Sequence, residues 1–202
     1  MIVKILFFLS LCCYAPLSQA QEVSFKDSLA AYNLHRISIT RTGMKVLGSW
    51  GIVNIAGGAV TYFTTTQDEW KYFSEMNVVW GAVNTGIAAM SLAGIRREMA
   101  IKMDYQQSYG RYRANNKLYL INAGLDVIYI GAGIGLTAYA QNTNKDQPIY
   151  SGFGKSIAVQ GIFLLLFDNI MFSANQLDNS KWFRLMNEIH FTGNSVGFNY
   201  SF

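Results

Sequence analysis

The stretch Leu118–Ala140 reads LYLINAGLDVIYIGAGIGLTAYA, an apolar run in which Asp126 is the single charged residue. Its length is close to the roughly 20 residues that an α-helix needs to cross the hydrocarbon of a bilayer. Three further runs have a similar length and composition, at Val46–Thr65, Met76–Ile95 and Ser156–Ala174. The sequence therefore predicts an all-α fold, a four-helix transmembrane bundle.

The overall composition supports a membrane protein. Of the 202 residues, 51% are hydrophobic and 14% are charged, whereas soluble globular chains carry about 25% charged residues. The alternative is a soluble bundle with very apolar helices. Runs that are apolar on all sides argue against it, because a helix at the surface of a soluble protein keeps a polar face.

The first 20 residues have the three parts of a secretory signal peptide. Lys4 is the basic end, Ile5–Pro16 is the apolar part, and Ser18, Gln19 and Ala20 form a small-x-small cleavage site. We therefore expect residues 1–20 to be a signal peptide and residues 21–202 to form one membrane domain.

Two features of the expected mature chain follow from this cleavage. Gln21–Arg41 is polar and predicts an N-terminal helix ahead of the first span. Cys12 and Cys13, the only cysteines, would be removed with the signal peptide. The mature chain would then have no disulfide, thiolate nucleophile or cysteine metal site.

Polar side chains recur at helical spacing within the four apolar runs. Spacings of four, seven and eight residues keep side chains on one face of a helix, so each run carries one polar stripe. The stripes consist of Trp50 and Asn54; Asn77, Asn84 and Ser91; Asn122 and Asp126; and Gln160 and Asp168. A bundle with every stripe turned inward would gather Asn54, Asn84, Asp126 and Asp168 at a similar depth.

Asp126 and Asp168 are the only charged residues in the four runs. A carboxylate in hydrocarbon costs roughly 2.5–3.5 kcal/mol, so it must be neutralised, paired or placed beside water. The candidate intramembrane polar site consists of Asp126, Asp168, Asn54, Asn84, Asn122 and Gln160.

Two interpretations of this site stay open. In the first, which is the function that we expect, the polar groups form hydrogen bonds from helix to helix in a protein with a structural or interaction role. In the second, Asp126 and Asp168 form the site of a small proton- or cation-coupled transporter or channel.

Catalysis finds little support in the sequence. The only histidines, His35 and His190, lie outside the apolar runs, and no Ser/His/Asp or metal-ligand spacing occurs. The glycine run Gly131–Gly135 follows no strand, so a nucleotide-binding loop is not expected. We therefore expect no catalytic residue, no cofactor and no metal site, and a protein that is not an enzyme.

The segment between the second and third runs is basic, and its orientation is ambiguous. Positive-inside logic places it in the cytoplasm, whereas a cleaved signal peptide would place it outside after two crossings. The net charge of +4 fits contact with anionic lipid headgroups. The basic residues that would make this contact are Arg96, Arg97, Lys102, Arg111 and Arg113.

The expected location is a membrane of the bacterial cell envelope, with an exported N-terminus, and the sequence does not distinguish the inner from the outer membrane. The lipid bilayer is the expected partner. A homo-oligomer is compatible with the sequence, and no nucleic-acid binding is expected.

Two features indicate how the helices pack. Trp50–Asn54 reads WGIVN and Trp80–Asn84 reads WGAVN, a faint repeat typical of a helical hairpin used as a unit. Gly131 and Gly135 are four residues apart, a spacing that lets two membrane helices approach closely.

The last eight residues, Ser195–Phe202, alternate between polar and apolar side chains and predict a short β-like tail. They resemble the closing strand of bacterial outer-membrane barrels. The other segments lack the alternation of about ten residues that a barrel requires, so a lone strand at the membrane interface is expected.

Three blocks carry a resemblance to a known family. They are Arg41–Gly58, Tyr72–Asn84 and Gly197–Phe202. Together they resemble a domain-of-unknown-function family of small four-span bacterial membrane proteins. The resemblance implies a four-span helical protein with a signal peptide and brings no activity. Ser74 stands where the family's second block is expected to have a histidine, which argues against a histidine role at that position.

Overall fold

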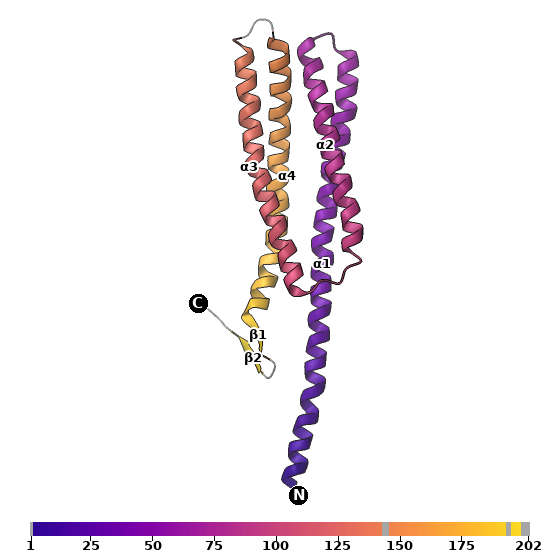
Figure 1. The fold of residues 1–202 in the computed structure, drawn as a ribbon, viewed down its shortest axis with the longest axis vertical. Helices are drawn as coiled ribbons and strands as arrows, with labels where there is room; N and C mark the ends of the chain where they lie inside the picture. The colour runs from indigo at the N-terminus through magenta and orange to yellow at the C-terminus, as the bar shows by residue number, and fades with distance from the viewer. Residues whose placement is uncertain (1, 143–145, 193–194, 199–202) are drawn as a thin grey trace.

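The computed structural model consists of four long helices, drawn in Figure 1 along the long axis of the molecule. It describes the backbone of residues 2–142, 146–192 and 195–198, and the side chains of residues 27–142 and 146–176. The helices are α1 (Ile2–Thr64), α2 (Asp68–Glu98), α3 (Tyr105–Ala140) and α4 (Gln147–Glu188).

Each of the four helices contains a stretch that is long and apolar enough to cross a membrane: Asp27–Thr64, Asp68–Glu98, Tyr105–Ala140 and Gln147–Gln176. The predicted all-α, four-helix transmembrane bundle is confirmed. The predicted runs all lie inside these helices, except that α1 ends one residue before Thr65.

The polar N-terminal segment is not a separate helix. Gln21–Arg41 lies within α1, which continues without a break into the first membrane span. The reason is local, because no proline or glycine interrupts residues 21–41. Residues 2–20 are also helical, and the cleavage expected after Ala20 stays a prediction.

The bundle is built from two helical hairpins, α1–α2 and α3–α4, as Figure 1 shows. The contact between the hairpins is made chiefly by α2 and α4, with a smaller contact between α1 and α4. At one end of this contact, Glu69 of α2 accepts hydrogen bonds from Lys155 and from the Ser151 hydroxyl of α4.

Glycines bring the backbones together within each hairpin. In the first, a Cβ atom added to Gly51 would lie 2.7 Å from the carbonyl oxygen of Gly81, and one added to Gly81 would lie 2.6 Å from that of Gly51. In the second, Gly133 and Gly154 approach each other in the same way. Such contacts require residues without a side chain.

The predicted role of Gly131 and Gly135 is wrong. Neither has any atom within 4 Å of an added Cβ, because both lie on the exposed side of α3. Gly133, between them in sequence, points in the opposite direction and faces α4. The Gly-x-x-x-Gly spacing identified a helix with small residues but selected the wrong face.

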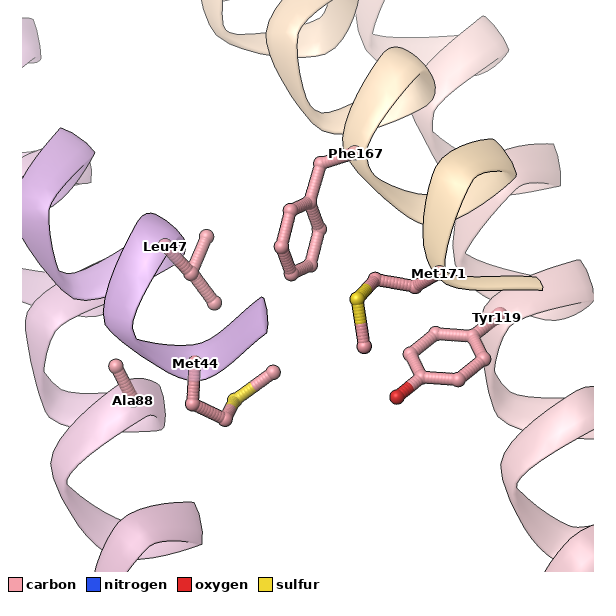
Figure 2. Packing of buried hydrophobic residues seen from close by; sticks show 6 residues of the cluster. All are labelled: Met44, Leu47, Ala88, Tyr119, Phe167 and Met171. Atoms are coloured by element: carbon pink, nitrogen blue, oxygen red, sulfur yellow. The ribbon is translucent and has the colours of Figure 1, made fainter. Parts of the chain in front are cut away.

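A small apolar cluster joins all four helices, as Figure 2 shows. Its buried members are Met44 and Leu47 of α1, Ala88 of α2, Tyr119 of α3, and Phe167 and Met171 of α4. Many of the large apolar side chains instead face outward; Phe63, for example, is 84% exposed. Lipid solvates such side chains, so the bundle needs no large apolar core.

Two short strands follow α4. The strands β1 (Ile189–Thr192) and β2 (Ser195–Phe198) pair in antiparallel orientation, with Ile189 opposite Phe198. Residues 199–202 and the side chains of the tail lie outside the described residues. The alternating strand expected at the membrane interface therefore stays a prediction.

The glycine contacts generate a stability prediction. Gly133→Ala places a methyl group against the Gly154 carbonyl, and overpacking of this kind typically costs about 1–3 kcal/mol. The matched control is Gly131→Ala on the same helix, which meets no neighbour and should leave stability unchanged or raise it by up to about 1 kcal/mol. Thermal unfolding of both variants in detergent measures the difference, and equal midpoints would contradict the close approach.

Candidate functional site

The buried polar residues form two separate groups, and the first is centred on Gln160 of α4, whose side chain is fully buried. Its amide nitrogen donates to Oδ1 of Asn54 at 2.7 Å and to Oδ1 of Asn77 at 2.8 Å. Its amide oxygen accepts from the Trp50 indole nitrogen at 2.8 Å. We call Trp50, Asn54, Asn77, Ser156 and Gln160 the amide cluster.

Further hydrogen bonds link the other members of the amide cluster. The Ser156 hydroxyl donates to Asn77 at 3.0 Å, and the Asn54 amide nitrogen donates to the backbone carbonyl of Trp50 at 2.7 Å. Trp50 is also held by a parallel stack on Phe163, with ring centroids 4.1 Å apart. These bonds connect α1, α2 and α4 and occupy most of the polar groups of the amide cluster, so the cluster offers little to a ligand.

The second group lines a cavity of about 340 Å³ between the two hairpins. Seven Asn, Asp, Ser and Thr side chains from all four helices line it: Thr40 of α1, Asn84 and Ser91 of α2, Asn115, Asn122 and Asp126 of α3, and Asp168 of α4. Asp126 is 2% exposed and Asp168 is 4% exposed. We call this space the carboxyl cavity.

The two aspartates of the carboxyl cavity lie within hydrogen-bonding reach of each other, and Asn122 is a further partner of Asp168. Two carboxylates cannot bond directly, since neither has a hydrogen to donate. A direct hydrogen bond between them therefore requires that at least one of the two carboxyl groups is protonated. Among the described residues, no lysine, arginine or histidine lines the cavity to compensate a second negative charge.

Two buried polar atoms of the carboxyl cavity have no partner in the described part of the chain. They are Oδ2 of Asp126, an acceptor, and the amide nitrogen of Asn84, a donor. Both side chains are 2% exposed. A buried polar group without a hydrogen bond is costly, so this cavity is suited to receive water, an ion or a polar group of a ligand.

The prediction that Asn54, Asn84, Asp126 and Asp168 gather at one depth is wrong. Asn84, Asp126 and Asp168 do meet, together with Asn122, but Asn54 and Gln160 belong to the amide cluster. Gln160 and Asp168 share a face of α4 but are eight residues, about 12 Å, apart along its axis.

Antiparallel pairing explains why Asn54 and Asn84 separate. Gly51 and Gly81 face each other, and each asparagine lies three residues further along its own helix. Because α1 and α2 run in opposite directions, the two side chains lie about 9 Å apart along the bundle. The sequence did not predict that Ser156 belongs to the amide cluster or that Trp80 and Tyr129 line the carboxyl cavity. Of these three, only Trp80 was marked by a sequence pattern, the WGxVN repeat.

A larger cavity of about 560 Å³ lies near the α3–α4 turn. Its walls are mostly apolar, and Lys155 is the one charged residue among the described residues that line it. Asp126 and Asn84, which carry the unpartnered polar atoms of the carboxyl cavity, do not line this larger cavity. The carboxyl cavity is therefore the better candidate for a functional site.

Residues 46–169 match the model of a family of unknown function, DUF6992. The chain belongs to this family. The matched region includes all of the amide cluster and, of the carboxyl cavity, Asn84, Asn122, Asp126 and Asp168. The resemblance to a family of unknown function is confirmed. No curated protein and no solved structure matches the chain.

The amide cluster generates a second stability prediction. Gln160→Leu removes the partner of Trp50, Asn54 and Asn77 at once, and at about 0.6 kcal/mol for each bond in a bilayer the expected loss is about 2 kcal/mol. The control is Asn169→Leu on the same helix, because Asn169 is exposed and bonds its own backbone at Leu165. Unfolding midpoints in detergent compare the two; an unchanged Gln160→Leu midpoint would exclude a structural role for the cluster.

Proposed function

We propose that this membrane protein is a small proton- or cation-coupled transporter or channel that uses Asp126 and Asp168. Two carboxyl groups from different helices meet in one cavity between the hairpins, and Oδ2 of Asp126 has no partner among the described residues. This arrangement carries the proposal, because an intramembrane acid beside an open space is typical of ion and proton pathways.

The chemistry follows from charge balance. With one shared proton the pair carries a single negative charge, and release of the proton leaves two. A bound monovalent cation would restore the original charge, so proton and cation compete for the site. Asn122, as a partner of Asp168, would orient that carboxyl group, and Asn84 would supply the nearby neutral amide.

We further propose that the protein is not an enzyme. The polar groups that face the carboxyl cavity from the four membrane helices are carboxyl, amide and hydroxyl groups with indole and phenol rings. These groups suit binding and proton exchange, and none of them forms a nucleophile–base pair in the described contacts.

A structural or interaction role is the second candidate, and the amide cluster favours it. Its hydrogen bonds join three helices, and most of its polar groups are already bonded within the cluster. In this alternative the carboxyl cavity would hold only water, and the whole polar interior would serve to fix the arrangement of the helices.

We propose a membrane of the bacterial cell envelope as the location, with the N-terminus exported. Arg96, Arg97, Lys102, Arg111 and Arg113 are exposed around the α2–α3 turn. Their positions support contact with anionic lipid headgroups. Arg111 also lies 3.9 Å from Glu98, which the buried Arg36 contacts at 2.5 Å.

The transport proposal is tested by flux in proteoliposomes. Asp126→Asn and Asp168→Asn keep the size of the side chain but remove its ionisation, so each should reduce proton or monovalent cation flux at least tenfold. The control is Asp68→Asn, an exposed residue at the start of α2, which should retain the parent flux. Absence of flux in the parent protein would leave the structural role as the better explanation.

The orientation is tested with single cysteines. Gln106 is exposed just after the α2–α3 turn, so we choose Gln106→Cys for labelling. The nearby Ser108 is not suitable, because it is fully buried and accepts a hydrogen bond from Asn33 at 2.8 Å. With an exported N-terminus, a membrane-impermeant maleimide should label Gln106→Cys in intact cells but should not label Gln141→Cys at the opposite end. The parent protein reports background from Cys12 and Cys13, and the reverse pattern would contradict the proposed orientation.

A further inference from the structure

We infer that the carboxyl cavity binds an amphiphilic amine, an ammonium group on an apolar body that also has one hydrogen-bond acceptor, and that this ligand enters from the lipid between α2 and α3. The inference rests on the proposed function, since it names the kind of cation that Asp126 and Asp168 would take.

The polar groups of the cavity define one end of the ligand. Oδ2 of Asp126 is an acceptor without a partner, and it belongs to the acidic pair. An ammonium group supplies both the hydrogen bond and the positive charge that this position requires. The Asn84 amide nitrogen is a donor without a partner among the described residues. A neutral acceptor on the ligand would accept a hydrogen bond from this nitrogen.

The walls of the cavity define the rest of the ligand. Trp80 and Tyr129 form an edge-to-face pair with ring centroids 5.2 Å apart, and both line the cavity with Phe167. Aromatic faces attract ammonium groups. The remaining lining residues are seven with aliphatic or thioether side chains and four with polar groups, the latter being Thr40, Ser91, Asn115 and Tyr119. Such a lining fits an apolar body better than a hydrated ion.

The size of the cavity also fits an organic ligand. At about 340 Å³ it falls within the range of about 300–1,000 Å³ that small-molecule pockets occupy. A bare Na⁺ or Mg²⁺ would need a closely spaced shell of oxygen ligands. An anion is disfavoured, because the described lining contains two aspartates and no basic residue.

The opening of the cavity faces lipid. Val83 and Ile87 of α2, and Leu118 and Leu125 of α3, line the cavity and are also exposed on the outer surface; Val83 is 47% exposed and Leu118 is 54% exposed. These side chains mark an entrance between α2 and α3, since the hairpins are joined chiefly through α2 and α4. A ligand dissolved in the bilayer could therefore reach Asp126 without crossing water.

Equilibrium dialysis of the purified full-length protein in an uncharged detergent tests the inference. The probes are radiolabelled 2-phenoxyethylamine, which is an ammonium ion at neutral pH and carries an ether oxygen as the acceptor, and 2-phenoxyethanol, its neutral counterpart. The parent protein should bind the amine at least tenfold more tightly than the alcohol. In Asp126→Asn the ratio of the affinities for the amine and the alcohol should fall at least tenfold, whereas Asp68→Asn should keep the parent ratio.

Three results would overturn the inference. They are equal binding of the amine and the alcohol, parent-like amine binding by Asp126→Asn, and absence of amine binding by the parent. Asp168→Asn replaces Asp126→Asn if the latter does not fold, with thermal unfolding as the check. If carboxylate-dependent flux persists in proteoliposomes while amine binding is absent, only the ligand class is wrong; if both are absent, the proposed function fails as well.

Discussion

A polar side chain in hydrocarbon has no water to bond, so it must find a partner on its own helix or on a neighbouring one. This constraint organises the interior of the bundle. Gln160 meets it fully, because its amide bonds side chains of α1 and α2. Asp126 meets it only in part, because one oxygen has no partner among the described residues. The difference between these two residues separates the part of the interior that holds the helices together from the part that can receive a ligand.

The glycine contacts determine which polar residues can meet. Gly51 and Gly81 bring α1 and α2 together at equivalent positions of the WGxVN repeat. Since the helices run in opposite directions, this contact places Asn54 in the amide cluster and its counterpart Asn84 at the carboxyl cavity. One short repeated sequence thus contributes the same residue types to two different environments.

The sequence predicted the four spans because about 20 apolar residues in a row have few other structures available. It also predicted that Asp126 and Asp168 face inward, because an unpaired carboxylate cannot face lipid. It could not predict the depth of each polar residue, which depends on the register between helices. Register here follows from contacts such as Gly133 with Gly154, and glycine spacing alone favoured the wrong pair, Gly131 and Gly135.

The link between Glu69 of α2 and Lys155 and Ser151 of α4 has a mechanical consequence. Lipid tails can replace helix–helix contacts without a hydrophobic penalty, so the apolar surfaces of the two hairpins resist separation only weakly. The Glu69 link, near the end of the bundle where α2 begins, and the Gln160 bonds to α1 and α2 hold the hairpins together on one side of the carboxyl cavity, and the bond from Asn33 of α1 to Ser108 of α3 holds them on the other. Because polar bonds between the hairpins lie on both sides of the carboxyl cavity, a bilayer of different thickness would have to strain or break one of them before α2 and α3 could separate.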